Sequence, residues 1–282
     1  MEDRYVLVLI SLNPDSSDLA GFVYPKEGYI EARHYKPDTN IRYGFYGTLW
    51  GECTEDKWLN TDAAAQWRVV RVDKNSEIIA LDASQNFIKF RRGQVSHAGD
   101  KFSCAKYITD HTEFQSESLM GGELLSFSKD SHILSKGYES TACTENTGSH
   151  AINVATKGIS RASGYMSHAV ALGRQGEAIA TGEDGHAISL FKSIAKGKGS
   201  RAVCIEDNGH VVVGKNGVGI ALGVDCTAVG GEHSVLILAV KQGKQTRFAV
   251  GYVGEGLDAG IIYRLNPEGF FEEVGSPVLA HG

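Results

Sequence analysis

A chain of 282 residues with 42% hydrophobic and 22% charged residues has the composition of a folded protein, which excludes wholesale disorder. It contains 34 glycines and only 5 prolines, which excludes collagen-like and proline-rich chains and favours tight turns between short strands. The net charge of −6 argues against nucleic-acid binding and against binding to an anionic membrane. Because the 5 cysteines show no C-x-x-C spacing, we expect reduced thiols in a cytoplasmic protein.

Residues 1–120 show no internal repeat and are expected to form a small α+β domain. The run YVLVLI near the start is too short for a signal-peptide core or a membrane span, and it predicts a buried strand. The runs WRVVRVD, EIIALDA and NFIKFRR are also typical of short strands. Residues 60–67 predict a short helix, with Thr61 or Asp62 as its N-cap and three alanines to continue it.

Residues 121–231 repeat a unit of small and apolar residues followed by a turn. Successive units step by nine residues, with one phase slip after Ala187. Such a unit holds one short strand and one corner, so two units make a coil of 18 residues, and stacked coils bury what one coil cannot. The sequence therefore predicts a mainly β protein with a β-solenoid of either hand. The side chains predicted to face inward are Val170, Leu172, Ile179, Ile188 and Leu190.

Residues 232–282 are predicted to cap the solenoid. The segment SVLILAVKQGKQTRFAVGYV contains two alternating strands around Gln-Gly-Lys, which is typical of a hairpin. A second strand, turn and strand follow in GIIYRLNPEGFFEEV. A cap of this kind would cover the open sheet edge at the end of a solenoid, where aggregation otherwise begins.

Four histidines recur with a constant step of 18 residues: His132, His150, His168 and His186. One histidine per coil predicts a stacked row along one edge of the solenoid. We interpret this row as structural and without bound metal, because a straight row does not offer the converging ligands that zinc needs. Metal or anion binding and pH sensing stay open as alternatives, since stacked imidazoles resist charging together.

A second cluster of candidate residues lies in the N-terminal region, where aromatic and basic side chains crowd a short window. Aromatic residues and arginine are the types most enriched at binding hot spots. We expect these residues to bind a protein partner. The predicted binding residues are Arg33, His34, Arg42, Tyr43, Tyr46 and Trp50.

Other charged motifs favour simpler interpretations. In KFRRGQ, Lys89 and Arg91 are expected on one solvated strand face, with contact to an acidic partner as the alternative. The stretch TDHTE (109–113) is interpreted as a polar linker. No G-x-S-x-G, Walker or H-E-x-x-H motif occurs, so we predict no catalytic residues, no metal and no cofactor.

The repeat Ser-His-Ala-Val-Ala-Leu-Gly resembles the β-roll heads of trimeric autotransporter adhesins. The wider layout resembles uncharacterised bacteriophage and prophage proteins, which combine a mixed N-terminal domain, Gly/Ala-rich solenoid repeats and a Tyr-[Arg/Lys]-Leu…Gly-x-Phe-x-Glu-Val tail. Here that tail begins at Tyr263 and ends at Val274. The resemblance implies a solenoid fold and supplies no activity.

Together these patterns favour a cytoplasmic, non-enzymatic binding or inhibitory protein of a mobile element or interbacterial-conflict locus. Its partner would be a protein such as a toxin or defence factor, and oligomers are possible. A structural phage or adhesin-like component is one alternative. An enzyme with its site in the N-terminal domain is another, and it would gather His34, Cys104, Asp110 and His111 in a pocket.

Overall fold

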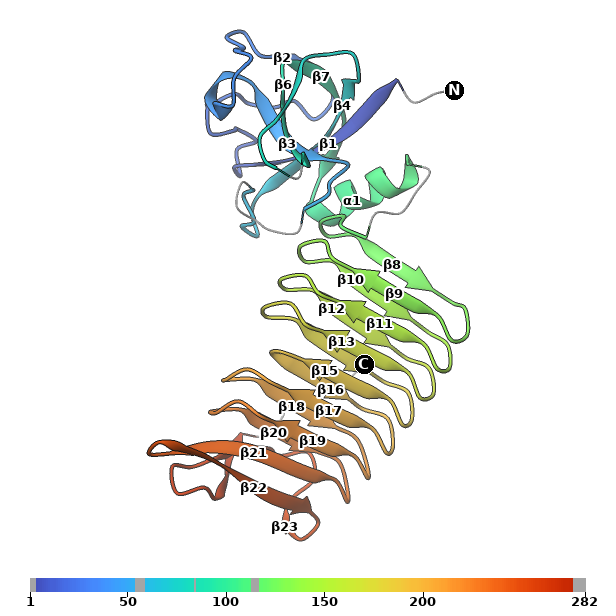
Figure 1. The fold of residues 1–282 in the computed structure, drawn as a ribbon, viewed down its shortest axis with the longest axis vertical. Coiled ribbons are helices and arrows are strands. Elements are labelled where there is room, and N and C mark those ends of the chain that lie inside the picture. The colour runs from blue at the N-terminus through green and yellow to red at the C-terminus, as the bar shows by residue number, and fades with distance from the viewer. Residues whose placement is uncertain (1–3, 54–58, 84, 113–116, 276–282) are drawn as a thin grey trace. The chain divides into compact units, whose positions relative to one another are not determined.

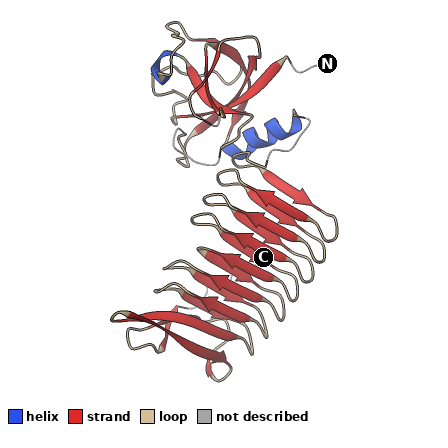
Figure 2. Cartoon of the chain, in the orientation of Figure 1, coloured by secondary structure: helices blue, strands red, loops and turns tan. Residues whose placement is uncertain are grey.

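The computed structural model describes residues 4–53, 59–83, 85–112 and 117–275. It divides into two units, Met1–Gly122 and Glu123–Gly282. Strands dominate both units, and the second is a β-solenoid (Figure 2). The predicted mainly β class, with its solenoid and small N-terminal domain, is confirmed. None of the helices in the described part of the chain is long and apolar enough to cross a membrane.

Unit 1 is built on one antiparallel sheet of seven strands in the order β2-β7-β4-β1-β3-β6-β5. Apolar side chains from the central strands, such as Val8, Val70 and Phe90, are fully buried in its core. The elements are β1 (Tyr5–Leu12), β2 (Gly28–Glu31), the 3-10 turn η1 (Ile41–Tyr43), β3 (Phe45–Leu49), β4 (Gln66–Asp73), β5 (Ile78–Ala80), β6 (Phe87–Phe90), β7 (Arg92–Gly99) and helix α1 (Lys101–Asp110).

The helix predicted at residues 60–67 is wrong. Strand β4 begins at Gln66, and Trp67 pairs with Ser11 of β1 and is buried. Burying the indole in the sheet outweighs the weak helical preference of three alanines. The helix of this unit is α1, where Asp100 caps the first turn by accepting a hydrogen bond of 2.7 Å from the Ser103 backbone N–H.

The coils of the solenoid form two sheets of parallel strands, and successive strands of the chain belong to the two sheets in turn (Figure 1). The strands of the β8 sheet are β8 (Glu123–Ser126), β10 (Thr141–Thr144), β12 (Ile159–Ala162), β14 (Glu177–Ala180), β16 (Lys192–Ala195), β18 (His210–Val213) and β20 (Thr227–Gly230). Those of the β9 sheet are β9 (His132–Ser135), β11 (His150–Asn153), β13 (His168–Ala171), β15 (His186–Ser189), β17 (Arg201–Cys204), β19 (Val218–Ala221) and β21 (Val235–Gln242). Equivalent residues pair from coil to coil, as His150 pairs with His168.

The predicted inward row is wrong. In β13, Ala169 and Ala171 are fully buried, whereas Val170 faces outward, and Leu172 beyond the strand is 47% exposed. The interior of the coils contains mainly small side chains, chiefly alanine and serine, with cysteine and valine at some positions. Side chains do alternate between the two faces of each strand, as the sequence predicts. The residues that face inward are the small ones, each one position away from the predicted apolar residue.

The corners of the coils depend on a left-handed residue that is seldom glycine. Asp184, Asn208 and Asn216 have φ between 51° and 58°, a region that asparagine and aspartate tolerate better than most residues. The phase slip after Ala187 is a shortened corner in which only Leu190 and Phe191 separate β15 from β16. Pairing continues across it, since Lys192 aligns with Glu177.

The C-terminal segment contains the two predicted strand-turn-strand units, and these extend both sheets. Strand β22 (Gln245–Val253) pairs antiparallel with β21 around a turn at Gly243, and β23 (Gly256–Leu257) follows it. Strands β24 (Ile262–Leu265) and β25 (Phe271–Gly275) continue the β8 sheet from β20. Larger side chains such as Leu236, Leu238 and Tyr263 fill the interior at this end.

Candidate functional site

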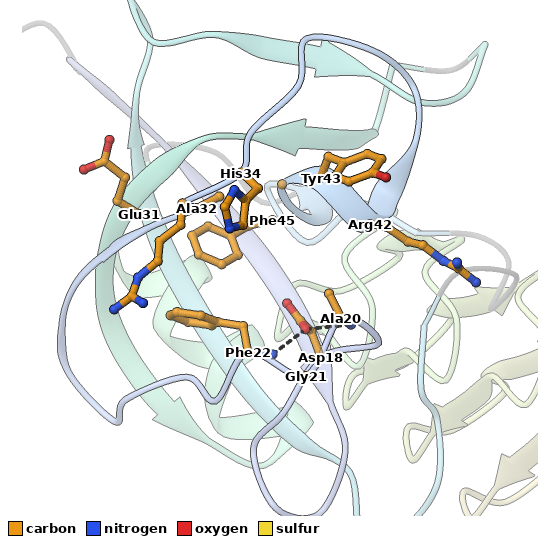
Figure 3. A pocket seen from close by; sticks show the side chains of 12 residues that line it. Asp18, Ala20, Gly21, Phe22, Glu31, Ala32, His34, Arg42, Tyr43 and Phe45 are labelled. Atoms are coloured by element: carbon orange, nitrogen blue, oxygen red, sulfur yellow. Dashed lines mark hydrogen bonds between the residues drawn. The ribbon is translucent and has the colours of Figure 1, made fainter.

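Two surfaces of the described residues combine position and chemistry: a pocket in unit 1 and the outer face of the β9 sheet. The pocket has a volume of about 390 Å³ and gathers four of the six predicted binding residues, Arg33, His34, Arg42 and Tyr43. Tyr46 instead lines a neighbouring hollow, and Trp50 lines neither. Figure 3 shows Arg42 and Glu31 extending outward on opposite sides of the pocket.

The pocket wall is apolar and its floor is polar. The rings of Phe22 and Phe45 lie 4.8 Å apart. Below them Asp18 accepts hydrogen bonds from the backbone N–H groups of Ala20 and Phe22 at 2.9 and 3.0 Å. Burial raises the pKa of the Asp18 carboxyl group, and those hydrogen bonds oppose the rise. The floor carboxylate is therefore already engaged by the chain itself.

Lys89 holds the loop that carries the basic residues of this pocket. Its side chain is fully buried, and Nζ donates to the Asp38 carbonyl at 2.6 Å, the Asp38 carboxylate at 2.9 Å and the Asn40 carbonyl at 2.8 Å. The prediction that Lys89 lies on a solvated face is wrong. The large apolar residues around Lys89 in NFIKF are all buried, and they are a sequence signal that this lysine is not a surface residue. Arg91 is exposed and pairs with Glu31 at 3.2 Å.

Cys104, Asp110 and His111, which the enzyme alternative would gather with His34, do not line the pocket that contains His34. Cys104 is fully buried on α1, and burial raises the pKa of its thiol to about 12, so it is not an available nucleophile. Asp110 ends α1 and pairs with Lys106 at 3.0 Å. His111 caps the helix, where Nδ1 lies 2.8 Å from the Tyr107 carbonyl oxygen. The rest of the 109–113 cluster, Glu113, lies outside the described residues.

The second surface is the outer face of the β9 sheet, which we call the apolar face. Each coil contributes the first and third residues of its strand and the residue that follows the strand, and all three side chains point outward. The third-position row is Leu134, Ile152, Val170, Ile188, Val203, Ile220 and Ile237. The row after the strand begins with Lys136 in the first coil and continues with Val154, Leu172, Leu190, Ile205 and Leu222.

The four predicted histidines form the first-position row of this face. Neighbouring ring centroids lie 4.6 Å apart from His132 to His186. Arg201 continues the row, with Nη1 2.9 Å from His186 Nε2. Burial lowers the pKa of His150 and His168, and the neighbouring imidazole lowers it further. Among the described residues, no group of three or more His, Cys, Asp or Glu side chains is placed to hold a metal.

The outer face of the β8 sheet differs sharply from the apolar face. Its outward residues include Arg161 and an ion pair between Lys192 and Glu177 at 2.8 Å. Charged side chains occur in its first-position row, and Arg161 interrupts its third-position row, which is continuously aliphatic only from Ile179 to Val229. The same repeat thus builds one mixed face and one apolar face.

Comparison with known proteins gives one consistent group of relatives. They are ice nucleation proteins. The chain is 33% identical over 111 residues to ice nucleation protein InaU of Pantoea ananas, 32% over 111 residues to one of Pseudomonas fluorescens and 31% over 103 residues to one of Pseudomonas syringae. These matches cover 39%, 39% and 36% of this chain, but only 10%, 9% and 8% of the relatives. No family model and no solved structure matches.

These relatives correct the sequence-based interpretation of function. The prediction of a cytoplasmic immunity or anti-defence protein is wrong, because the relatives are ice nucleation proteins. The resemblance to bacteriophage and prophage proteins likewise finds no support, although the repeat solenoid itself fits. Composition and cysteine spacing do not distinguish a conflict protein from a structural solenoid. The expected protein partner stays a prediction.

Proposed function

We propose that this protein is a structural, adhesin-like component whose solenoid associates with a second copy of itself through the apolar face. The observation that carries the proposal is the unbroken third-position row from Leu134 to Ile237. A soluble monomer rarely presents so regular an apolar surface to water. The row even continues onto the cap, where Phe248, Val250 and Tyr252 are 53%, 50% and 51% exposed.

The size of the apolar face suits a stable interface. Eight strands from β9 to β22 at a spacing of about 4.8 Å span about 38 Å, and five residues at about 3.3 Å span about 16 Å. The flat footprint is then about 600 Å², and corrugation by side chains enlarges it. Stable complexes bury about 800 Å² on each partner, so this face is of the right order.

The spacing of the rows favours a second copy over an unrelated partner. Side chains that repeat once per coil can interdigitate along their whole length only with rows of equal spacing, and this chain supplies such rows. The three rows from His132 to Ile237 contain no carboxylate among the described residues, so two copies would not set acids against one another. Arg201 is the one cation within the third to sixth coils of the face.

Sedimentation velocity on a matched pair of variants tests the proposal. Ile188→Lys places a charge on the apolar face, whereas Ile194→Lys places it at the same strand position on the β8 sheet. We expect the unmodified chain and Ile194→Lys to form oligomers at micromolar concentrations and Ile188→Lys to be a folded monomer. A monomeric unmodified chain would reject the proposal, as would equal oligomers in both variants with unchanged circular dichroism.

A second candidate function is ice nucleation, which the similarity to ice nucleation proteins favours. Rows of identical spacing on the apolar face would present a regular surface to water. The test is the freezing temperature of droplets that contain the folded chain, compared with droplets that contain the heat-denatured chain. Equal freezing temperatures would reject this function and leave self-association untouched.

A further inference from the structure

We propose that the pocket of unit 1 binds a small organic anion, with an aromatic body against Phe22 and Phe45 and a carboxylate or phosphoryl group that pairs with Arg33 or Arg42 at the rim. The volume of about 390 Å³ suits a small molecule and is far too small for a folded partner. Because this pocket lies within unit 1, the proposal is independent of self-association by the solenoid.

The charges of the pocket select an anion. Its two carboxylates are engaged, since Glu31 pairs with Arg91 and Asp18 accepts backbone N–H groups. By contrast, Arg33, His34 and Arg42 make no side-chain hydrogen bond or ion pair with any described residue. Two arginines without protein partners leave their planar donor groups available, and these match carboxylate and phosphate geometry.

The apolar wall selects an organic body on that anion. Phe22 packs at 5.0 Å against Tyr24 and at 4.8 Å against Phe45, so the wall is held from behind. Gly21 lines the pocket beside this wall, is exposed and has a φ of +81°, which favours glycine. The chain therefore places no side chain at this position, and the half-buried Phe22 beside it stays accessible there from solvent.

The loop that carries Arg42 is fixed before any ligand arrives. The three hydrogen bonds from Lys89 Nζ fasten Asp38 and Asn40, and the Lys36 N–H donates to the Tyr43 carbonyl at 3.1 Å. The Asn40 side chain also accepts from the Arg42 backbone N–H at 3.1 Å. A loop held in this way loses little conformational entropy on binding, which raises affinity.

Titration of the full chain with four simple probes, followed by the amide NMR signals of Ala20, Gly21 and Phe22, tests the proposal. The probes are benzoate, phenyl phosphate, inorganic phosphate and neutral benzyl alcohol. We expect at least one aromatic anion to bind at least tenfold more tightly than both inorganic phosphate and benzyl alcohol. The stronger of benzoate and phenyl phosphate then identifies the anionic group of the ligand.

Matched variants assign the binding to the two arginines. Arg33→Gln combined with Arg42→Gln should weaken binding of the aromatic anion at least tenfold, while Arg4→Gln, which removes an exposed arginine outside the pocket, should not change it. All three arginines are exposed, so the variants should fold. Equal affinity for the anions and benzyl alcohol would overturn the proposal, and so would unchanged binding in the double variant.

Discussion

At the scale of single residues, the most informative side chain is a charged one that is fully buried. Lys89 is a charged residue with no exposed surface, and its ammonium group replaces the water it has lost with three oxygen partners. The guanidinium-bearing loop of the unit 1 pocket therefore depends on a lysine that does not line it. Lys89 therefore holds the loop in place, whereas Arg33 and Arg42 on that loop line the pocket.

Lys89→Met should lower the free energy of unfolding of unit 1 by about 1–3 kcal/mol, because two carbonyl groups and the Asp38 carboxylate lose their donor. Methionine keeps much of the buried volume, so the sheet itself should persist. Urea denaturation followed by tryptophan fluorescence measures the change. Arg91→Met, just after the same strand and at an exposed ion pair, should change the stability much less. Equal effects would mean that Lys89 does not anchor the loop.

Glycine occupies several solenoid corners where coils touch through their backbones, although Asn146 and Ala155 hold the equivalent position in earlier coils. A Cβ at Gly182 would overlap the carbonyl oxygen of Gly164 in the coil beneath. Gly182→Ala should therefore lower the free energy of unfolding of the solenoid by about 2–3 kcal/mol. Gly185→Ser is the control, because Ser167 and Ser200 occupy the equivalent corner position. A thermal midpoint that falls equally in both variants would contradict this account.

At the scale of elements, the sequence predicts the strands and corners well but not which way the strands face. Small and large residues alternate along each strand, so the sequence shows that one kind faces inward and the other outward. The alternation itself does not show which kind faces inward. The usual expectation that larger apolar residues go inside fails here, because Ala169 and Ala187 are fully buried while the larger residues beside them face outward. The pocket is predictable only in part, since Phe22 lines it and Lys89 holds its loop only once the chain is folded, and neither lies near Arg42 in the sequence.

The corrected orientation predicts opposite outcomes at neighbouring positions of β13. Ala169→Leu should destabilise the solenoid by about 3 kcal/mol, because a large side chain would be forced between two close sheets. Leu172→Asp should leave the thermal midpoint of the isolated monomer nearly unchanged, because its side chain is already 47% exposed. Circular dichroism melts at low protein concentration measure both. Unfolding of Leu172→Asp alone would restore the original inward row.

The histidine row should make the solenoid sensitive to mild acid. The pKa of His150, His168 and His186 lies below its ordinary value, mainly because burial disfavours the charged ring. Arg201 lowers the pKa of His186 further, and Asp184 opposes this shift. The unfolded chain then takes up protons at a higher pH than the folded chain does. Stability is fully present above the ordinary pKa of about 6.5, and it is lost as the pH falls from there through the lowered values.

Urea midpoints at pH 7.5 and pH 5.0 measure this effect. We expect the midpoint of the unmodified solenoid to be lower at pH 5.0, and the difference to shrink when His150 and His168 are both replaced by glutamine. Burial also lowers the pKa of His210, which lies on the β8 sheet outside the row, so replacing it with glutamine measures the share that a histidine outside the row contributes. An unchanged pH dependence in the double variant would show that the row is not the source.

At the scale of the whole molecule, the chain joins two units with different kinds of stability. Unit 1 is an antiparallel sheet with a core of large side chains such as Leu9 and Phe90. The solenoid buries mostly alanine and serine and gains its stability from repeated parallel pairing along about six turns. A unit with so small an interior side-chain volume benefits most from covering its outer apolar face.

Calorimetry should therefore resolve two unfolding transitions, only one of which depends on protein concentration. Self-association stabilises the folded solenoid by mass action, so a tenfold rise in concentration should raise its midpoint by a few degrees. The transition of unit 1 should stay fixed. In Ile188→Lys, which charges the apolar face, the solenoid transition should also become independent of concentration, while Ile194→Lys should retain the shift. If neither transition moves with concentration in the unmodified chain, the apolar face does not join two copies.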